Sequence, residues 1–363
     1  MINSRLMKAI LILILVSCLI VEHKVSACSA FGICKGKHII VGKNLDWFCN
    51  TAFLVVNKRN VTKKTFLSSG SSILEWTSKY GSITFTQNGV GFTSGGMNEA
   101  GLVIEESWLG QTQFPAADER PVIDEIQWIQ YQLDNCSTVE EVISTNPKLR
   151  IQKYFGESHY FVYDKSGNAA AIDFLNGEMV YHLIKKSDVQ VLTNDAYELS
   201  ADSLKNFEGF GGRRIIPMGT KSIYRFARAA KIVKNYERND STDIIDYGFG
   251  ILSNISQRST AWSVVYDISN LRIYYKTSSS PEIKEVSFNK FNFDCSSPMM
   301  LIEINIQIKG DISNLFERYT LDKNRNLVTK VIKNWRENNF ALNITDEEVD
   351  KIIQYPETMR CNN

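Results

Sequence analysis

A cysteine at position 28 and an aspartate at position 46 are the residues of this sequence whose types and spacing suggest catalysis. If the chain is cut immediately before Cys28, a thiol and a new α-amino group belong to one residue. The pKa of an α-amino group is ordinarily ~7.7–8.0 and that of a thiol ~8.5. The amine can therefore accept the thiol proton at neutral pH without a histidine. Asp46 would hold and orient the resulting ammonium group.

Residues 1–27 have the three parts of a secretory signal. Arg5 and Lys8 form a basic start, residues 9–21 are apolar, and residues 25–27 are small residues of the kind that signal peptidase reads. The apolar run is shorter than the ~20 residues that span a bilayer. We therefore predict a signal peptide at 1–27 and a single domain at 28–363, located in the periplasm or secreted.

A bacterial lipoprotein signal is the alternative interpretation of this segment. A lipidated Cys28 with an acylated amine would lose both halves of the catalyst, leaving a non-catalytic envelope protein. Residues 22–24 separate the apolar run from the cysteine, which is unlike the usual lipoprotein arrangement. We therefore prefer cleavage without a lipid anchor and expect no stable membrane insertion afterwards.

The composition is that of an ordinary globular protein, with 44% hydrophobic and 22% charged residues. Without Arg5, Lys8, Lys24 and Glu22, the 41 basic and 40 acidic residues become 38 and 39. A net charge so close to zero gives no reason to expect nucleic acid as a partner.

Six cysteines follow residue 27 and none forms a C-x-x-C pair, so we predict no structural zinc site. Some could form disulfides in an exported protein, although the sequence does not give their connectivity. No metal-ligand spacing or phosphate-binding loop is present, and we therefore predict no cofactor.

Apolar periodicity predicts a layered order of strands and helices. The expected strands cover 29–33, 38–41, 54–57, 82–86, 91–94, 102–106, 160–163, 169–174, 179–183, 189–192, 262–267, 271–276 and 300–309. The expected helices are one opening at Pro121 and others over 139–144, 221–238, 243–253, 327–337 and 347–355, the last with a capping box of Thr345 and Glu348. This order is typical of an α+β fold in which helices cover two packed antiparallel sheets.

Five segments occur in the order found in one enzyme family: Cys28, GKNLDW at 42–47, GMNEAGLVI at 96–104, VLTN at 191–194 and SIYRF at 222–226. Together they resemble the choloylglycine hydrolases, which include bile salt hydrolases and penicillin V acylases. The resemblance covers nearly all of the chain from Cys28 to about residue 276. It implies a four-layer αββα N-terminal-nucleophile fold and hydrolysis of a linear, non-peptide amide bond in a small N-acyl substrate.

The resemblance also implies roles for individual residues. Cys28 matches the nucleophile, Asp46 the carboxylate beside the terminal amine, and Asn194 an oxyanion-site asparagine. Arg225 matches an arginine near the nucleophile, and Arg228 is the alternative one helical turn further on. The backbone N–H that follows Trp108 would complete the oxyanion hole, a group whose loss costs about 10²–10³ in rate.

Lys43 departs from the family, which usually has arginine three residues before the aspartate. Lysine lacks the rigid fork of donors that arginine offers to a carboxylate. We still place Lys43 in the catalytic group, because a nearby cation favours the thiolate form of a cysteine. We expect lysine at this position to affect the catalytic rate more than the fold.

Trp47 and Trp108 are the predicted substrate-binding residues. Bile salt hydrolases have asparagine at the position of Trp108 and Gram-positive penicillin V acylases have tyrosine. The two tryptophans resemble the Gram-negative penicillin V acylases, which also cleave acyl-homoserine lactones and among which homo-tetramers are common. Two indoles beside a nucleophile favour an aromatic or aliphatic acyl group. Conjugated bile salts are the alternative substrate.

A papain-type pairing of Cys28 with His159 is a different catalytic hypothesis. The sequence around Cys28 lacks the papain signature, and the chain before the cysteine, which papain needs, would be removed. We therefore interpret His159 as a structural residue near the start of a strand.

Overall fold

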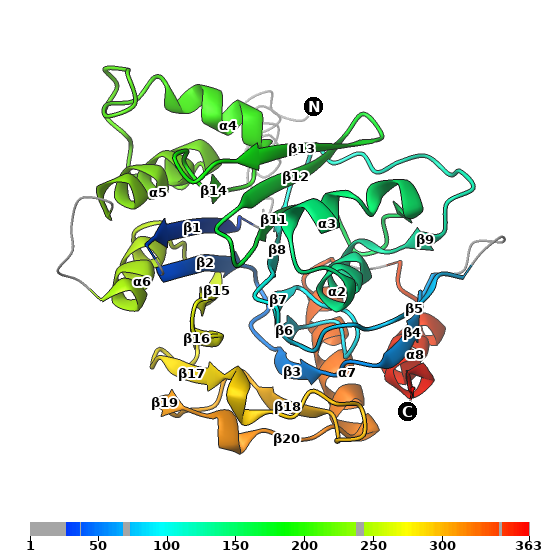
Figure 1. The fold of residues 1–363 in the computed structure, drawn as a ribbon. Helices are drawn as coiled ribbons and strands as arrows, with labels where there is room; N and C mark the ends of the chain where they lie inside the picture. Colours follow the sequence, from blue (N-terminus) through cyan, green and yellow to red (C-terminus); the bar gives the residue numbers. More distant parts are fainter. Residues whose placement is uncertain (1–26, 37, 68–72, 237–242, 341–342, 363) are drawn as a thin grey trace, which may run out of the picture.

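The computed structural model describes residues 27–362 except 37, 68–72, 237–242 and 341–342 (Figure 1). The predicted signal peptide, apart from Ala27, lies outside the described residues. Two large sheets form the body of the molecule, and neighbouring strands are antiparallel with one exception, the parallel pair β17–β19.

The first sheet has seven strands, and its strand β1 begins immediately after Cys28. Its order is β14, β1, β2, β15, β16, β17 and β19. The bounds are β14 Val191–Leu192, β1 Ser29–Lys35, β2 His38–Asp46, β15 Thr260–Asp267, β16 Arg272–Thr277, β17 Lys284–Ser287 and β19 Gly310–Asp311.

The second sheet has nine strands in the order β13, β12, β11, β8, β7, β6, β3, β18 and β20. The bounds are β13 Glu178–Ile184, β12 Ala169–Leu175, β11 Ser158–Tyr163, β8 Val103–Trp108, β7 Gly95–Asn98, β6 Ser82–Thr86, β3 Phe53–Asn57, β18 Met300–Glu303 and β20 Glu317–Arg318. Two small sheets join β9 Val122–Ile123 to β10 Arg150–Ile151, and β4 Val61–Lys64 to β5 Glu75–Thr77 and β21 Arg360–Cys361.

Helices cover the outer faces of both sheets (Figure 1). The first sheet is covered by α5 Ser222–Tyr236 and α6 Ile244–Asn254, with α4 Tyr197–Leu204 beside α5. The second sheet is covered by α2 Glu125–Asn135 and α3 Val139–Ile143, and at its β3–β18 side by α7 Leu321–Glu337 and α8 Asp346–Gln354.

Alternation along β1 shows why the sheets are sandwiched between helices. Ala30 faces the core between the two sheets, whereas Phe31 faces the core under α5 and α6. Since successive side chains of a strand point to opposite faces, a strand buried on both sides has apolar residues at consecutive positions. The Phe31 ring lies over Gly42 of β2, where a Cβ would come within 2.1 Å of it. The predicted four-layer αββα fold is confirmed.

Several predicted boundaries are wrong. Residues 91–94 form a turn, and the strand is β7, which begins at Gly95. Val122 and Ile123 form β9, because the helix begins only at Glu125, after Asp124 accepts the N–H groups of Ile126 and Gln127 as the N-cap. The strand expected over 300–309 ends at Glu303.

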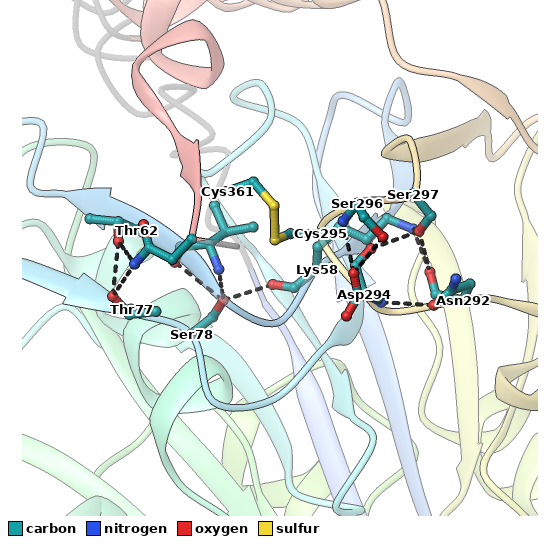
Figure 2. Close-up of a disulfide and its surroundings, with 12 residues drawn as sticks. Lys58, Thr62, Thr77, Ser78, Asn292, Asp294, Cys295, Ser296, Ser297 and Cys361 are labelled. Carbon is teal, nitrogen blue, oxygen red and sulfur yellow. Dashed lines mark hydrogen bonds between the residues drawn. A yellow bond between two sulfur atoms is a disulfide. The ribbon is translucent and has the colours of Figure 1, made fainter.

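The chain end is fastened to the body of the protein by a disulfide between Cys295 and Cys361, with a Cα–Cα distance of 5.4 Å (Figure 2). Cys361 lies on β21, which pairs with β4 through Cys361–Val61 and Arg360–Thr62. Ser78 donates a hydrogen bond to the Lys58 carbonyl just below this pairing (Figure 2). The disulfide therefore closes residues 295–361, which include β18, α7 and α8, into one covalent loop.

Candidate active site

The hairpin of β1 and β2 brings the two predicted chemical residues together. Ser29 pairs with Asn44, so Cys28, one residue before β1, lies beside the end of β2, where Asp46 is located. Cys28 is 2% exposed and Asp46 is fully buried. Nineteen residues of sequence are thus closed into one short hairpin, as the spacing predicts.

The Asp46 carboxylate is held by β15 and by the turn before it. A register shift in β15 places Thr260 opposite Asp46, and the Thr260 hydroxyl donates a hydrogen bond to Oδ1. Gln257 Nε2 donates to Oδ2 at 2.8 Å, and Arg225 Nη1 lies 4.0 Å from the same oxygen. Burial raises the pKa of Asp46 to about 6, although Thr260, Arg225 and Gln257 favour the carboxylate.

Ala27 precedes Cys28 in this structure, and its carbonyl belongs to the peptide bond that the predicted cut would break. The Ala27 carbonyl accepts hydrogen bonds from Gln257 Nε2 at 2.9 Å and from Arg225 Nη1 at 3.3 Å. Gln257 therefore contacts both Asp46 and the peptide group that precedes Cys28. The α-nitrogen of Cys28 consequently lies in the polar group around Asp46.

Arg225 of α5 reaches Cys28 with a side chain that is 1% exposed. Its Nη1 donates to the Cys28 carbonyl at 2.6 Å and to the Ser29 hydroxyl, and its Nε donates to the Thr220 carbonyl. The alternative, Arg228, donates to the carbonyls of Pro217 and Gly219 instead. The structure therefore places Arg225, and not Arg228, beside Cys28.

Asn194 connects Arg225 to the end of β8. Its Oδ1 accepts a hydrogen bond from Arg225 Nη2 at 2.7 Å, and its Nδ2 donates to the Trp108 carbonyl at 2.8 Å. One amide hydrogen of Nδ2 remains for another acceptor. The backbone N–H that follows Trp108 belongs to Leu109 and donates to the Glu157 carbonyl at 3.0 Å. Its predicted place in the oxyanion hole is therefore wrong for this geometry.

Lys43 is buried and forms an ion pair with a carboxylate of the second sheet. Its Nζ lies 3.4 Å from Glu105 Oε2 and also donates to the Glu106 carbonyl. Burial alone would lower the pKa of Lys43, but the charges of Cys28, Glu105 and Glu106 outweigh it and raise the pKa. By the same attraction Lys43 favours the thiolate form of Cys28. Glu105, rather than Asp46, is the carboxylate that Lys43 binds.

Two substitutions that together leave the net charge unchanged can test whether Lys43 favours the thiolate of Cys28 or only neutralises Glu105. We expect Lys43→Met to lower the free energy of unfolding by about 3–5 kcal/mol, because it leaves Glu105 buried without its cation. Adding Glu105→Gln should restore most of that stability. We expect the double variant to have a kcat/KM at least about tenfold below the unmodified protein and a pH profile displaced to alkaline values.

The measurements are urea unfolding and pH–rate profiles on the single and double variants. Glu105→Gln alone is the matched control, since it keeps the cation near Cys28. A double variant with full activity and an unchanged pH profile would mean that Lys43 serves only to neutralise Glu105.

A cavity that opens to solvent adjoins Cys28; the space in and in front of it that is free of protein atoms amounts to about 560 Å³. Both predicted substrate-binding residues, Trp47 and Trp108, line it. The other lining residues are Leu45, Gln87, Asn88, Ser94, Glu106, Ser107, Glu125, Ile126, Phe155, Gly156, Ser158, Trp335 and Phe340. Apolar and aromatic side chains with a few polar groups are typical of a small-molecule site.

Two carboxyl groups also line this cavity. Burial, opposed by the charge of Lys43 and assisted by that of Glu125, raises the pKa of Glu106 to about 7. The Glu125 carboxylate accepts the backbone N–H groups of residues 154–156 and so fixes the loop that carries Phe155. Glu125 therefore has a clear positioning task, whereas Glu106 faces the cavity with Ser158 as its partner.

His159 has a structural partner. Its Nδ1 lies 2.8 Å from Asp173 Oδ1, and both side chains are fully buried. His159 does not line the cavity beside Cys28. The geometry therefore agrees with the structural interpretation and gives no support to a papain-type pair.

Among the residues of this site that sequence reasoning missed are Thr260, Gln257, Glu106, Trp335 and Phe340. Thr260 and Gln257 lie more than 200 positions after Asp46, and no short-range pattern links them to it. Glu106 could have been noted as a strand residue two positions before Trp108, on the same face of β8.

Within the described part of the chain, no three His, Cys, Asp or Glu side chains come together as a metal site. Over the same residues, no helix combines the length and apolarity that crossing a membrane requires.

Comparison with known proteins agrees with the geometry. The family model of linear amide C–N hydrolases, choloylglycine hydrolase family, matches residues 28–301. A penicillin V acylase from Pectobacterium atrosepticum is 27% identical over 296 residues, covering 70% of this chain and 78% of that protein.

Two solved structures share the fold. Penicillin V acylase from Agrobacterium tumefaciens superposes with a TM-score of 0.71 at 23% identity, over 81% of this chain and 98% of that one. A variant of the conjugated bile acid hydrolase from Clostridium perfringens superposes with a TM-score of 0.63 at 19% identity, over 81% and 97%.

Proposed function

The chain belongs to the choloylglycine hydrolase family of linear amide C–N hydrolases, and from this we propose that it is an exported N-terminal-cysteine amidohydrolase of the penicillin V acylase type. The observation that carries the proposal is the hydrogen-bonded group around the Ala27–Cys28 peptide, beside a largely apolar cavity. Gln257 and Arg225 each contact this peptide group and approach Asp46. A cut before Cys28 would create its α-amine within that group.

The proposed reaction begins with transfer of the thiol proton of Cys28 to its own α-amine. The sulfur attacks the amide carbonyl carbon, and negative charge gathers on the carbonyl oxygen. This oxygen accepts a hydrogen bond from the second N–H of Asn194 Nδ2. The ammonium, held by Asp46, then protonates the departing amine as the C–N bond breaks. A thioester remains. A water molecule loses a proton to the α-amine and attacks the thioester carbon, the C–S bond breaks to release the acid, and the thiolate takes the proton back from the ammonium.

Arg225 is proposed to act by positioning. It binds the Cys28 carbonyl and the Asn194 amide oxygen, and so fixes the nucleophile and the oxyanion donor relative to each other. A displacement of about 1 Å between such groups can cost about 10²-fold in rate. The buried guanidinium is well suited to this task because its donors lie in a rigid plane.

We propose that the substrate carries an aromatic or slim aliphatic acyl group. Penicillin V and acyl-homoserine lactones are both substrates of this kind. Trp47 and Trp108 lie on the cavity wall and offer flat apolar surface. The relative from Pectobacterium atrosepticum is a penicillin V acylase, which supports this choice. Conjugated bile salts are the competing substrate class.

A substrate panel is expected to rank these classes. We expect kcat/KM for phenoxyacetyl or long-chain acyl amides to exceed that for glycine- or taurine-conjugated bile salts by about ten- to a hundredfold, because burying a ring or several methylenes is worth about 1.5–3 kcal/mol. Trp108→Ala should lower kcat/KM for the preferred substrate more than for bile salts. Faster hydrolysis of bile salts than of both competitors would overturn the assignment.

A gentler variant serves as the control for Trp108. A Cβ at Gly156 would lie 2.6 Å from Trp108 Cζ3, so Gly156→Ala should displace the indole without removing it. We expect the same change of preference with a smaller amplitude. If Trp108→Ala instead lowers the melting temperature and all activities equally, Trp108 supports the fold and not the selectivity.

Export to the periplasm or beyond the cell, and assembly into a homo-tetramer, are part of the proposal. Residues 1–27 have the pattern of a signal peptide, and disulfides such as Cys295–Cys361 persist in oxidising compartments. The mass of the mature chain and its sedimentation coefficient test the two parts separately.

A further inference from the structure

We propose that the segment after residue 301 decides which acyl groups the cavity accepts, and that it selects acyl groups ending in a flat aromatic ring. Two side chains of this segment, Trp335 of α7 and Phe340 just after it, line the cavity beside Cys28. The match to the family model ends at residue 301. The inference rests on the proposed amidase function and extends it to a wall that the matched residues do not contain.

The two side chains contact the residue that follows Asp46. The ring centroid of Phe340 lies 4.9 Å from that of Trp47 at 84°, and 5.1 Å from that of Trp335 at 89°. Trp335 also lies 6.4 Å from Trp47 at 86° and 6.3 Å from Phe155 at 77°. Four rings from three distant parts of the sequence thus form one set of edge-to-face contacts around the cavity.

The end of α7 holds Phe340 in a defined position. Asn339 has a φ of 58°, the left-handed conformation that ends many helices. The Phe340 N–H donates to the Trp335 carbonyl at 2.8 Å and the Asn339 N–H donates to the Arg336 carbonyl at 3.1 Å. These two bonds, with the contact between the Phe340 and Trp335 rings, make a Schellman motif. The turn therefore places Phe340 against Trp335.

Buried anchors fix α7 itself to the body of the enzyme. Asn324 is fully buried, its Oδ1 accepts the Val90 N–H and its Nδ2 donates to the Ile353 carbonyl, each at 2.9 Å. Tyr355, after α8, donates to the Lys64 carbonyl at 2.7 Å. Trp335 is 3% exposed and packs in the same apolar cluster as Phe53 of β3. The wall is thus a fixed part of the site.

The arrangement favours a planar ring for a geometric reason. Aromatic rings attract each other most at the edge-to-face or offset angles seen here, at centroid distances of 4.5–7 Å. A flat ring entering among them can make such contacts, each worth about two- to tenfold in binding. A broad polycyclic acyl group would have to displace Phe340 or Trp335, whose positions are fixed by the turn and the core. An alkyl chain gains burial but no ring contact.

The test uses anilides that share one leaving group and differ only in the acyl part: phenoxyacetyl, acetyl, decanoyl and choloyl. We expect the unmodified enzyme, purified with a native Cys28, to prefer phenoxyacetyl anilide. In Phe340→Ala we expect the ratio of kcat/KM for phenoxyacetyl over acetyl anilide to fall about tenfold, while choloyl anilide gains relative to both. A ratio that changes less than about twofold would overturn the inference.

Val331→Ala is the matched control on the same helix. Val331 is fully buried in the core beneath α7 and does not line the cavity. We expect this variant to lose thermal stability and to keep the phenoxyacetyl-to-acetyl ratio. Asn339→Gly should also keep the ratio, since glycine adopts the left-handed conformation readily, whereas Asn339→Val should lower it. An equal loss of ratio in Val331→Ala would overturn the inference.

A binding measurement separates this inference from the proposed reaction. If no anilide is hydrolysed, the amidase proposal fails, but phenoxyacetic acid can still be titrated into Cys28→Ala and Cys28→Ala/Phe340→Ala with tryptophan fluorescence as the readout. A dissociation constant about tenfold higher in the double variant supports the aromatic wall. Equal dissociation constants contradict it whether or not the enzyme turns over.

Discussion

A chain that keeps even two residues ahead of Cys28 is expected to fold normally and to hydrolyse no amide. The predicted base is the α-amine of Cys28, and any preceding residue converts it into an amide that cannot accept a proton. The Ala27 carbonyl accepts hydrogen bonds from Gln257 and Arg225. We therefore expect the fold around Cys28 to accommodate an upstream residue, so that the loss of activity is chemical.

The comparison is between cytoplasmic chains that begin Met-Ala-Cys28 and chains processed to Cys28, with intact mass, circular dichroism and turnover measured on each. Cys28→Ala in the processed form is the inactive reference. Full activity from a chain shown by mass to be unprocessed would disprove the terminal amine as base. A diacylglyceryl group on Cys28 in the natively exported protein would instead support the lipid-anchored alternative.

Replacing Asp46 by asparagine is expected to lower activity and to raise stability. We expect kcat to fall by at least about 10²-fold, the scale of a positioned acid–base group, because the ammonium loses the carboxylate that orients it. The stability effect has the opposite sign. The pKa of Asp46 is about 6 in the folded chain against 3.8 for the ordinary group, so the folded state holds this proton more tightly than the unfolded state.

The contribution of Asp46 to stability is therefore fully present below pH about 3.8 and is lost as the pH rises through about 6. At pH 7 the difference between these two pKa values corresponds to about 3 kcal/mol of lost stability. Asparagine cannot accept hydrogen bonds from both Thr260 and Gln257 as the carboxylate does, and the unpaired donor lowers stability by about 1–2 kcal/mol, which offsets part of the gain. We expect Asp46→Asn in the uncut chain to be more stable by about 1 kcal/mol in urea unfolding at pH 7.

Asp134→Asn provides the matched control for a buried carboxylate. Asp134 accepts Lys63 Nζ at 2.8 Å in a pair that is fully buried. Burial raises the pKa of Asp134 as well, but neutralising it also leaves Lys63 buried without its anion. We expect that loss to outweigh the gain and to lower stability, with kcat unchanged. A stability loss of the same size in Asp46→Asn would contradict the raised pKa of Asp46.

The layered fold could be predicted because its signals are local. Strands that are buried on both faces have consecutive apolar residues, as in β11 and β12, and the Thr345–Glu348 capping box appears in the structure as expected. The errors occurred where tertiary contacts decide. Val122 and Ile123 continue an apolar helical pattern, but β10 pairs with them through Arg150 and Ile151.

The candidate site was predictable to the extent that it lies on the β1–β2 hairpin and in the family motifs. The partners of Asp46 come from β15 and the turn before it, and the aromatic wall comes from α7. Contacts over such separations depend on the whole fold and leave no short-range pattern. The sequence shows that Lys43 departs from the family pattern. It could not show that the ion-pair partner of Lys43 is Glu105, which lies on the facing sheet.

The disulfide between Cys295 and Cys361 has a consequence for the wall around the cavity. It closes a loop with a sequence separation of 66 residues, which contains α7, Phe340 and α8. In the chain-entropy account, closing such a loop lowers the entropy of the unfolded chain and so raises its free energy by about 4 kcal/mol. Cys28 and Asp46 lie outside this loop, so we expect the disulfide to constrain mainly the C-terminal segment. We therefore expect thiol reductants to loosen the segment that carries Trp335 and Phe340 before the β1–β2 hairpin. If this segment selects acyl groups as proposed, the selectivity of the enzyme would depend on the redox state of its compartment.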